Sequence, residues 1–550
     1  MPSSQNPAPK IPSSVDVIVV GAGLGGLYAH HRLRAMGLSL FGFEAAPEVG
    51  GTWFWNRYPG ARCDVESIDY TYSFSGDLLN SWKWSERYAT QPEILRYINH
   101  VADRFDLRRD VAFNTRVVGA RFDEATNRWT IETDRGETIS ARFLLTTVGC
   151  LSTPKAPEFD GLGDFQGRWV QTSAWPRDPV EITGKRVAII GTGSSGIQAI
   201  PVIAREAAQL TVFQRTPNFS LPARNGPIDP AYEAKVRADY AEHCRRNKLT
   251  KAGVQPKLAT GKSAFEVSEE ERLAAFEYAW GRGGGGLAGM YKDVMSDIAA
   301  NDLAADFVRD KIRQIVKDPE VAERLSPRDH PFATKRICLD SDYFETFNRP
   351  NVELVDIRAT PIERITRDGV KTSQAEYPVD LLIFATGFDA MTGPLLAMNI
   401  RGAGGLKLED AWKDGPSTYL GLMMAGFPNL FTVNGPGSPS VLANMIPTIE
   451  QHVDWIADCI AHMGAAGLQR IDAEPPAQDA WAHEVQAVAN QTLYPRARSW
   501  YMGDNVNGKP RMFLAYVGGF ADYAARCDEI ARDGYPGFRL SAPREAALAG

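Results

Sequence analysis

The sequence predicts an α/β protein built from two Rossmann-like dinucleotide-binding domains, with a helical insert. Two glycine-rich turns, Gly21-x-Gly23-x-x-Gly26 and Gly191-x-Gly193-x-x-Gly196, each follow a short β-branched run and precede an amphipathic one. Strand-like and helix-like spacings alternate around both turns, as they do in βαβ units. From about residue 224 to 330 charged amphipathic helices interrupt this alternation, which marks the insert.

The first turn has the features of a pyrophosphate site. It follows the apolar run Val15–Val20, and the amphipathic run Leu27–Met36 comes after it. Free N–H groups and the positive end of the dipole favour an anion at the N-terminus of such a helix. The next run, Leu38–Phe43, ends in Glu44, 18 residues after Gly26, where a carboxylate accepts hydrogen bonds from ribose hydroxyls. This unit suits FAD or NAD; a purely structural turn is the alternative.

Length, charge and composition narrow the class of protein. At 550 residues the chain is long enough for two or three domains. A net charge of −7 argues against nucleic acid and anionic membrane as partners. Six cysteines without a C-x-x-C pair predict reduced thiols in a cytoplasmic protein, and eight histidines without ligand spacing predict no metal site. Residues 1–13 predict a disordered leader, and no apolar run reaches the roughly 20 residues that span a bilayer.

The stretch Val49–Asp64 is dense in glycine, proline and large aromatic residues. We expect an irregular loop, rather than a helix, that lays backbone and flat rings against a flat ligand. An aromatic-packed core loop is the alternative. Arg62 and Asp64 favour the first interpretation, because charged groups beside so many aromatics usually face a cleft. Short strands at Val111–Val118, Arg128–Glu132 and Ala141–Thr147 are predicted to return the chain to the first sheet.

The second nucleotide unit differs from the first in the charge of the residue that follows its second strand. Its strand Lys185–Ile190 and helix Ile197–Ala208 repeat the first pattern, but Arg215 stands 19 residues after Gly196, where an acid would be expected. An arginine there suits the 2′-phosphate of NADP(H), which a carboxylate would repel. The two units together indicate a two-dinucleotide flavoprotein oxidoreductase.

The insert is predicted to hold three helices, at Tyr232–Asn247, Ser268–Trp280 and Asp302–Lys317. Ser268 and Glu271 form a capping box. The run Gly281–Gly286 predicts a flexible connection. Whether the insert shapes a cleft or is purely structural stays open at this point.

Later segments return the chain to the first domain. The strand Leu381–Ala385 ends in Thr-Gly, a long helix is predicted at Ile449–Met463, and Ser499–Pro510 predicts an ordered but mobile loop. The predicted domains are an FAD-binding domain in two parts (14–150 and 385–540), an NADP-binding domain in two parts (151–223 and 332–384) and the insert (224–331).

Together these residues resemble the class B flavoprotein monooxygenases, specifically the phenylacetone and steroid monooxygenase branch of the Baeyer–Villiger monooxygenases. The resemblance runs from about residue 15 to 540. It covers both glycine turns, Gly50-Gly51-x-Trp53, Tyr58-Pro59-Gly60, Asp64, Lys335-Arg336 and Ala385-Thr386-Gly387. The family fingerprint F-x-G-x-x-x-H-x-x-x-W-[PD] falls on residues 165–176 with Gln171 in place of its histidine. In the family that histidine serves domain coupling, so its loss bears on turnover and not on the fold.

The resemblance implies the reaction. NADPH reduces FAD, O₂ adds to give a C4a-peroxyflavin, and this species attacks a ketone, which becomes an ester or lactone. Arg336 would stabilise the anionic species, because a guanidinium keeps its charge, and Asp64 would orient Arg336. Trp500 would close over the NADP. The kinship favours a bulky cyclic, steroid-like or aryl ketone.

The catalytic residues implied are Arg336 and Asp64. The cofactor-binding residues implied are Gly21, Gly23, Gly26, Glu44, Thr52, Trp53, Trp55, Asp64, Tyr70, Val117, Met445, Gly191, Thr192, Gly193, Ser194, Ser195, Gly196, Gln198, Arg215, Thr216, Lys335, Arg336 and Trp500.

Several of these residues have structural alternatives. Lys335-Arg336 read alone is a surface basic pair, Asp64 a loop cap, Trp500 a packing residue and Met445 a core residue.

The whole chain also has alternatives. They are an N- or S-oxygenating flavin monooxygenase and a non-catalytic NADP-sensing protein. A disulfide reductase would need a cysteine pair that the chain lacks. The partners expected are a ketone and O₂, with no nucleic acid or membrane, in a monomer or weak homo-oligomer.

Overall fold

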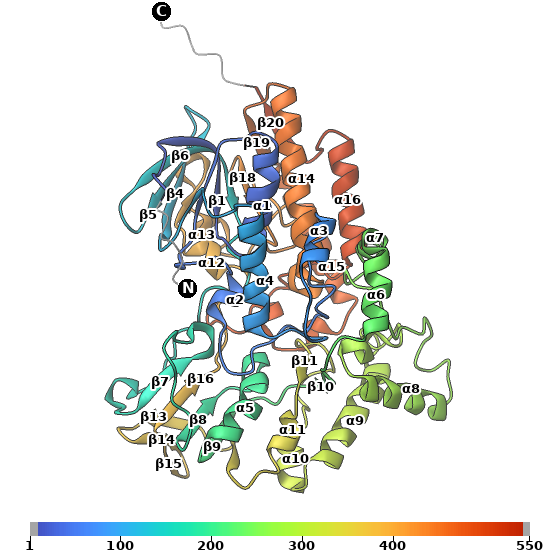
Figure 1. Ribbon diagram of the computed structural model, residues 1–550. Helices are drawn as coiled ribbons and strands as arrows, with labels where there is room; N and C mark the ends of the chain where they lie inside the picture. The colour runs from blue at the N-terminus through green and yellow to red at the C-terminus, as the bar shows by residue number, and fades with distance from the viewer. Residues whose placement is uncertain (1–8, 543–550) are drawn as a thin grey trace, which may run out of the picture.

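The computed structural model describes residues 9–542 and contains two parallel-stranded regions joined by helices (Figure 1). Most of the predicted leader, residues 1–8, lies outside the described residues, and residues 9–13 belong to no helix or strand. None of the helices in residues 9–542 combines the length and apolar character that crossing a membrane requires. Within the same residues, no three His, Cys, Asp or Glu side chains lie together as metal ligands would.

The first sheet has eight strands and carries the first glycine turn. Its strand order is β17-β4-β5-β6-β1-β2-β3, with β18 paired to β6. Strands β1, β2 and β3 run parallel, β6 pairs parallel with β1 over residues 140–146, and β5 pairs antiparallel with both β4 and β6. The strands are β1 Ser14–Val20, β2 Leu40–Phe43, β3 Val111–Ala112, β4 Val117–Asp123, β5 Arg128–Thr133, β6 Thr138–Thr146, β17 Ile400–Arg401 and β18 Leu430–Thr432.

The prediction of one strand over Val111–Val118 is wrong. The structure has β3 and β4 instead, separated by a turn in which Asn114 adopts a left-handed conformation with φ 52°. Asparagine tolerates this conformation because its short side chain bonds locally. The break sends β4 into the antiparallel excursion, while β3 stays beside β2.

The second sheet carries the second glycine turn and is fully parallel. Its order is β12-β9-β8-β16-β7. The strands are β7 Arg168–Gln171, β8 Arg186–Ile190, β9 Gln209–Gln214, β12 Val352–Asp356 and β16 Leu381–Phe384. Smaller sheets are formed by β10 Ser220–Pro222 with β11 Cys338–Asp340, by β13 Ile362–Ile365, β14 Gly369–Thr372 and β15 Glu376–Pro378, and by β19 Arg470–Ala473 with β20 Phe538–Ser541.

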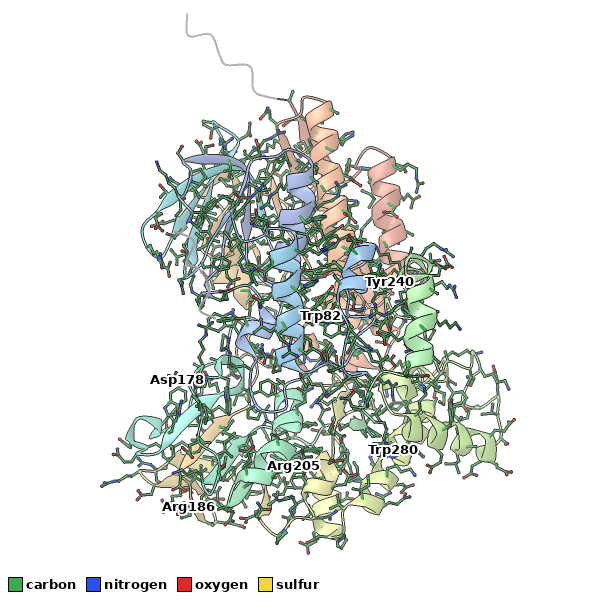
Figure 2. The ribbon with its side chains drawn as sticks, in the orientation of Figure 1. Trp82, Asp178, Arg186, Arg205, Tyr240 and Trp280 are labelled. Carbon is green, nitrogen blue, oxygen red and sulfur yellow. The ribbon has the colours of Figure 1, made fainter. Side chains whose placement is uncertain are left out.

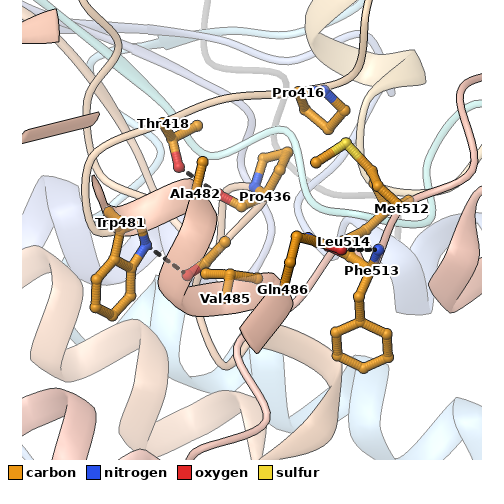
Figure 3. Close-up of a pocket in the computed structure, with 11 residues that line it drawn as sticks. Pro416, Thr418, Pro436, Trp481, Ala482, Val485, Gln486, Met512, Phe513 and Leu514 are labelled. Carbon is orange, nitrogen blue, oxygen red and sulfur yellow. Dashed lines mark hydrogen bonds between the residues drawn. The ribbon is translucent and has the colours of Figure 1, made fainter. Parts of the chain in front are cut away.

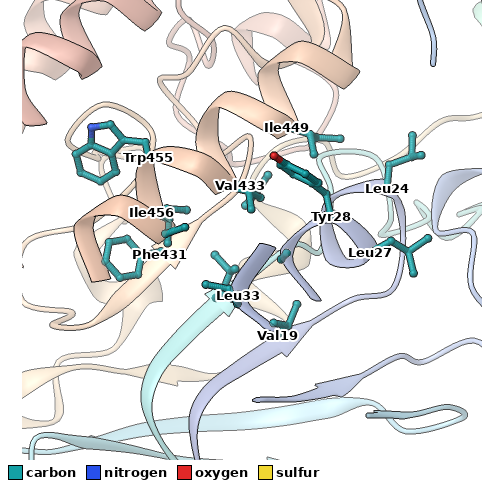
Figure 4. Close-up of a cluster of buried hydrophobic side chains, with 14 of the residues drawn as sticks. Val19, Leu24, Leu27, Tyr28, Leu33, Phe431, Val433, Ile449, Trp455 and Ile456 are labelled. Atoms are coloured by element: carbon teal, nitrogen blue, oxygen red, sulfur yellow. The ribbon is translucent and has the colours of Figure 1, made fainter. Parts of the chain in front are cut away.

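Helices cover both sheets. Outside the insert they are α1 Leu24–Ala35, α2 Thr52–Trp55, α3 Gly76–Ser81, α4 Gln91–Arg104, α5 Ser194–Glu206, α11 Tyr343–Thr346, α12 Gly393–Leu396, α13 Leu408–Ala411, α14 Met445–Ala465, α15 Pro475–Asn490 and α16 Phe520–Arg532. Helix α14 begins four residues before the predicted Ile449 and packs along α1, with Leu27, Leu33 and Ile456 buried between them and the Tyr28 hydroxyl donating to Asp454 at 2.8 Å (Figure 4). The late C-terminal helix thus completes the core of the first unit.

The insert contains five helices rather than three: α6 Pro230–Ala238, α7 Tyr240–Lys248, α8 Glu269–Arg282, α9 Ile298–Ile315 and α10 Pro319–Leu325. The single helix predicted at Tyr232–Asn247 is wrong, because Asp239 breaks it and caps α7 through its carboxylate. The capping box of Ser268 and Glu271 is present. The connection predicted at Gly281–Gly286 begins inside α8 and continues into a 3₁₀ turn at Gly285–Gly289.

Helix α7 fastens the insert to the first unit. The Tyr240 hydroxyl (labelled in Figure 2) donates to the carbonyls of Thr71 and Tyr72 at 3.1 and 3.2 Å. His243 contacts the buried Asp69 at 2.7 Å, and Lys248 pairs with the buried Glu450 at 3.2 Å. The backbone of Asn444, which caps α14, is bonded to Ala252 at 2.8 Å. The insert therefore helps to place the start of α14 and the adjacent Met445.

Candidate active site

The first glycine turn is a tight corner with an open helix end. A Cβ on Gly26 would lie 1.8 Å from the Gly21 carbonyl oxygen, and one on Gly21 would lie 2.7 Å from that of Thr147. Helix α1 starts after Gly23, which contributes no side-chain cap. The first-turn N–H groups are left available to a phosphate, as the sequence predicts.

Glu44 lies against this turn. Its carboxylate accepts from the backbone N–H groups of Ala22 and Ala46, each at 2.7 Å. Burial raises the pKa of Glu44, and these backbone hydrogen bonds oppose that shift. The two bonds leave further lone pairs on the carboxylate, so the geometry fits a ribose hydroxyl at this edge.

The aromatic stretch after Val49 also reaches the first turn. The predicted irregular loop is wrong in part, because Thr52–Trp55 form one helical turn, α2. Gly51, just before it, is so close to Gly23 that a Cβ would lie 2.8 Å from the Gly23 Cα. The Trp53 indole donates to the Tyr70 hydroxyl at 3.1 Å. Thr52, Trp53, Trp55 and Tyr70 therefore form one group beside the pyrophosphate corner.

Two predicted FAD-side residues lie farther along the same unit. Val117 starts β4 and is buried in the core of the first sheet, close to Thr115, whose N–H donates to the Glu44 carbonyl at 2.9 Å. Met445 starts α14 and packs half-buried between the core around α1 and a cluster that contains Tyr501.

The second glycine turn has the same corner but more room. Gly196 and Gly191 are as constrained as their counterparts, since a Cβ on Gly196 would lie 2.2 Å from the Gly191 carbonyl oxygen. A Cβ on Gly193 would meet nothing within 4 Å, and α5 starts without a side-chain cap. The Thr192 hydroxyl donates to the Thr216 carbonyl at 3.0 Å, which joins the turn to the end of β9. Ser194 and Ser195 occupy the first turn of α5.

Basic side chains gather beyond β9. Arg215 is exposed and makes no salt bridge in the part of the chain described. Burial lowers the pKa of Lys335; the nearby carboxylate of Asp329 opposes this shift, and the positive charges of Arg215 and Arg358 add to it. Neighbouring carboxylates do not fully neutralise the positive charge of these side chains, so the group fits a dianionic phosphate. Arg358 is a member of this group that the sequence did not single out.

Arg336 and Asp64, the two catalytic residues that the resemblance implies, form a bidentate ion pair. The Arg336 Nε and Nη2 atoms donate to Asp64 at 3.0 and 2.7 Å, and Nη1 donates to the Val441 carbonyl at 3.0 Å. The Asp64 carboxylate holds the pKa of Arg336 well above its usual range, although burial acts against this. A guanidinium has five N–H donors, so the hydrogen bonds to Asp64 and Val441 leave an Nη1 hydrogen unused, and the Tyr501 hydroxyl lies near the same guanidinium. Since 31% of the Arg336 side chain is exposed, this hydrogen can reach a ligand.

Gln198 and Gln171 also join parts of the chain that the sequence separates. The Gln198 amide accepts from the Tyr58 hydroxyl at 2.9 Å and donates to the Arg62 carbonyl at 3.1 Å, which ties α5 to the aromatic loop. Gln171, which replaces the fingerprint histidine, donates to the Lys155 carbonyl at 2.9 Å.

The segment around Trp500 packs against the buried cluster that contains Val441, whose carbonyl accepts a hydrogen bond from Arg336. Trp500 is half-buried and its ring centroid is 4.2 Å from that of Tyr501. Burial raises the pKa of Tyr501 to about 12, and the nearby Arg336 charge opposes the shift. Tyr501 and Val441 were not predicted, although Tyr501 adjoins Trp500 and Val441 lies in the loop before α14.

Two cavities elsewhere are not lined by Arg336 or Asp64. One, of about 10 Å³, lies between α15 and the segments around Pro436 and Phe513 (Figure 3). The other is an open groove of about 600 Å³ along α4, lined among others by Arg57, Arg96 and His100.

Two glycine corners, one beside the carboxylate of Glu44 and one beside the cations of Arg215 and Lys335, lie in the two units that the half-buried Arg336–Asp64 pair joins. This arrangement defines a two-dinucleotide flavoprotein oxidoreductase. All six cysteines are free, so none forms a disulfide. A family model described as pyridine nucleotide-disulphide oxidoreductase matches residues 18–252.

Comparison with known proteins specifies the class. A Baeyer-Villiger monooxygenase from Pseudooceanicola batsensis is 44% identical over 94% of this chain and 95% of its own length. The phenazine N-monooxygenase PhzNO1 of Lysobacter antibioticus is 42% identical over 97% of this chain and 98% of its own. A solved structure of oxidized steroid monooxygenase bound to NADP matches with a TM-score of 0.92 and 53% identity over 96% of this chain and 99% of that one. The chain therefore belongs to the Baeyer–Villiger monooxygenase family. It is an NADPH-dependent monooxygenase, and its cofactors are FAD and NADP(H).

Proposed function

We propose that the protein oxidises bulky cyclic, steroid-like or aryl ketones to esters or lactones, with Arg336 as the catalytic cation. The observation that carries this proposal is the Nη1 hydrogen of Arg336 that remains free while Asp64 holds the other edge of the guanidinium. When bound, NADPH supplies the hydride and FAD activates O₂ for insertion of one oxygen atom beside the carbonyl. Arg336 faces the negative charge that develops in this step and cannot lose its own proton.

Asp64 acts through Arg336. Its two oxygens fix the plane of the guanidinium, so the free N–H points in one direction before the substrate arrives. Such preorganisation is what makes a donor effective, because no reorganisation is needed during the reaction. Trp500 and Tyr501 would cover the nicotinamide side and limit access of water.

The cofactor assignments rest on the two corners. We propose that Glu44 and the group Thr52, Trp53, Trp55 and Tyr70 hold FAD, and that Arg215, Thr216 and Lys335 hold the 2′-phosphate of NADP(H). We also propose the domain boundaries predicted from the sequence, with FAD held by residues 14–150 and 385–540 and NADP(H) by residues 151–223 and 332–384. We also propose a cytoplasmic protein that is a monomer or a weak homo-oligomer.

A panel of cyclic, aryl and aliphatic ketones, incubated with NADPH and O₂ and analysed by product mass, tests the proposal. We expect ester or lactone masses, greatest for bulky ketones. The resemblance to a phenazine N-monooxygenase makes N-oxygenation the second candidate. Formation of N-oxides from aromatic amines, without ester from any ketone, would favour that candidate instead.

A further inference from the structure

The segment that carries Trp500 and Tyr501 has little regular structure of its own. After a 3₁₀ turn at Trp500–Met502, residues 503–519, all of them described, form no helix or strand. The segment folds back on itself, with the Met512 N–H donating to the Met502 carbonyl at 3.2 Å and the Leu514 N–H to the Tyr501 carbonyl at 2.8 Å. The position of Tyr501 therefore depends on what holds residues 512–514.

Leu514 is held by the turn before α14. The Gly437 N–H donates to the Leu514 carbonyl at 2.9 Å, and the Tyr516 N–H donates to the Ser438 carbonyl at 2.8 Å. In an extended chain, neighbouring residues direct their N–H and C=O groups to opposite sides. Phe513 consequently presents its backbone groups away from these partners, and at 1% exposure they cannot turn to water.

The side chain of Gln486 satisfies both backbone groups of Phe513. The Phe513 N–H donates to Gln486 Oε1 at 3.0 Å, and Gln486 Nε2 donates to the Phe513 carbonyl at 2.8 Å (Figure 3). The amide thus takes the place of a residue in a neighbouring antiparallel strand, which exchanges the same two hydrogen bonds. Gln486 belongs to α15, whose Trp481 donates to the Gly437 carbonyl at 3.1 Å, so one helix holds both the segment and the turn beside it.

Phe513 in turn contacts the aromatic side chains that face the site. Its ring centroid lies 6.2 Å from that of Tyr501 and 5.3 Å from that of Tyr494. Phe513, Tyr501 and Val441 belong to one buried cluster, and the Val441 carbonyl accepts from Arg336. A shift of Phe513 would therefore move the side chains packed around the Arg336 contact.

We propose that Gln486 is a positioning residue of the reaction, which supplies the missing strand partner of Phe513 and thereby holds Trp500 and Tyr501 at the cofactor site. This inference rests on the function proposed above for Trp500 and Arg336. It assigns no contact between Gln486 and substrate or cofactor.

The test compares Gln486→Leu with Gln478→Leu on the FAD-loaded enzyme. Gln478 lies on the same helix and accepts from the Ala425 N–H at 2.8 Å, so it matches the loss of a backbone hydrogen bond without touching the Trp500 segment. Three quantities are measured: the rate of trypsin cleavage after Arg511, the KM and kcat for NADPH oxidation, and the amount of ester formed per NADPH oxidised.

For Gln486→Leu we expect cleavage about tenfold faster than in wild type, since two hydrogen bonds that close the segment are lost. We also expect a higher KM for NADPH and a lower ester fraction, with the rate of flavin bleaching unchanged. Gln478→Leu should match wild type in the cleavage rate, the KM for NADPH, the ester fraction and the rate of flavin bleaching. Gln486→Glu, which keeps the acceptor but loses the donor, should fall between them and carries the test if the leucine variant does not fold.

Cleavage and KM at wild-type values in both Gln486 variants would overturn the proposal. Faster cleavage with unchanged KM and ester fraction would also overturn it, because Gln486 would then only stabilise the segment. The cleavage readout needs no turnover. A protein that makes no ester from any ketone, yet shows faster cleavage and weaker NADP⁺ binding in Gln486→Leu, would refute the proposed reaction and leave the positioning role standing.

Discussion

Asp64 and Arg336, 272 residues apart in sequence, form a two-point contact in which both carboxylate oxygens accept from one edge of the guanidinium at 2.7 to 3.0 Å. This edge-on geometry leaves the opposite edge to Val441 and to a ligand.

Arg336→Ala should leave flavin reduction by NADPH unchanged and strongly lower the rate of ester formation. Loss of one preorganised donor typically costs about 100- to 1,000-fold in rate. Anaerobic bleaching of the flavin and product mass under O₂ measure the two steps separately. Ester formation at the wild-type rate would remove Arg336 from the mechanism. Arg62→Ala, next but one to Asp64 and paired with Glu86, serves as control.

Asp64→Asn should lower ester formation less than Arg336→Ala, because the cation remains but loses its fixed orientation. If Asp64 acts only through Arg336, the double variant should be no slower than Arg336→Ala alone, since changes within one contact do not add. Ester formation rates of the four proteins form the cycle. An additive loss would mean that Asp64 has a separate role.

Arg215→Ala should raise the KM for NADPH by about 10- to 100-fold, the range for losing a hydrogen bond to a charged group. The KM for NADH should change little, because NADH lacks the 2′-phosphate. Steady-state oxidation of both cofactors gives the comparison, and Arg205→Ala, an exposed arginine paired with Asp342, is the control. Equal effects on the two cofactors would contradict the phosphate assignment.

Gln171→Leu should increase the fraction of NADPH that is oxidised without ester formation, because it removes the hydrogen bond that holds Lys155 beside β7. Lys155 also donates through Nζ to the Asn505 carbonyl at 3.0 Å and so reaches the Trp500 segment. Gln171→His keeps an N–H donor and should stay close to wild type. The ratio of ester to NADPH consumed measures the effect. A leucine variant as well coupled as wild type would show that this contact is dispensable.

Asp340→Asn should stabilise the protein more at pH 8 than at pH 5. Burial raises the pKa of Asp340 to about 7 from an ordinary 3.8, and hydrogen bonds from Ser220 and the Tyr343 N–H oppose the shift. Because the folded state binds this proton more tightly than the unfolded chain, wild type loses about 1.4 kcal/mol per pH unit as the pH rises between these values. Melting temperatures at both pH values test this, with the exposed Asp342→Asn as control. A constant difference between Asp340→Asn and wild type would contradict it.

The local patterns in the sequence were sufficient for the architecture. Glycine spacing predicts a tight turn at the strand–helix corner, and the charge of the residue after the next strand differs between the two units, so both glycine corners could be predicted. Helix and strand ends were less predictable. Asp239 breaks one predicted helix because its carboxylate caps the next one, and Asn114 breaks one predicted strand because it adopts a left-handed conformation, so in each case one residue outweighs the periodicity around it.

The sequence by itself determined the two nucleotide corners, the Glu44–Arg215 difference and the identity of the Arg336 and Asp64 candidates, because backbone sterics and side-chain charge act over a few residues. Only the tertiary structure decided that Asp64 contacts Arg336 and that Lys335 lies close enough to Arg215 and Arg358 for their charges to act on it. It also decided that Gln486 forms hydrogen bonds with the backbone groups of Phe513. These contacts depend on how two sheets and their helices pack. Packing brings together residues that are far apart along the chain, and no local pattern in the sequence predicts which of them will meet.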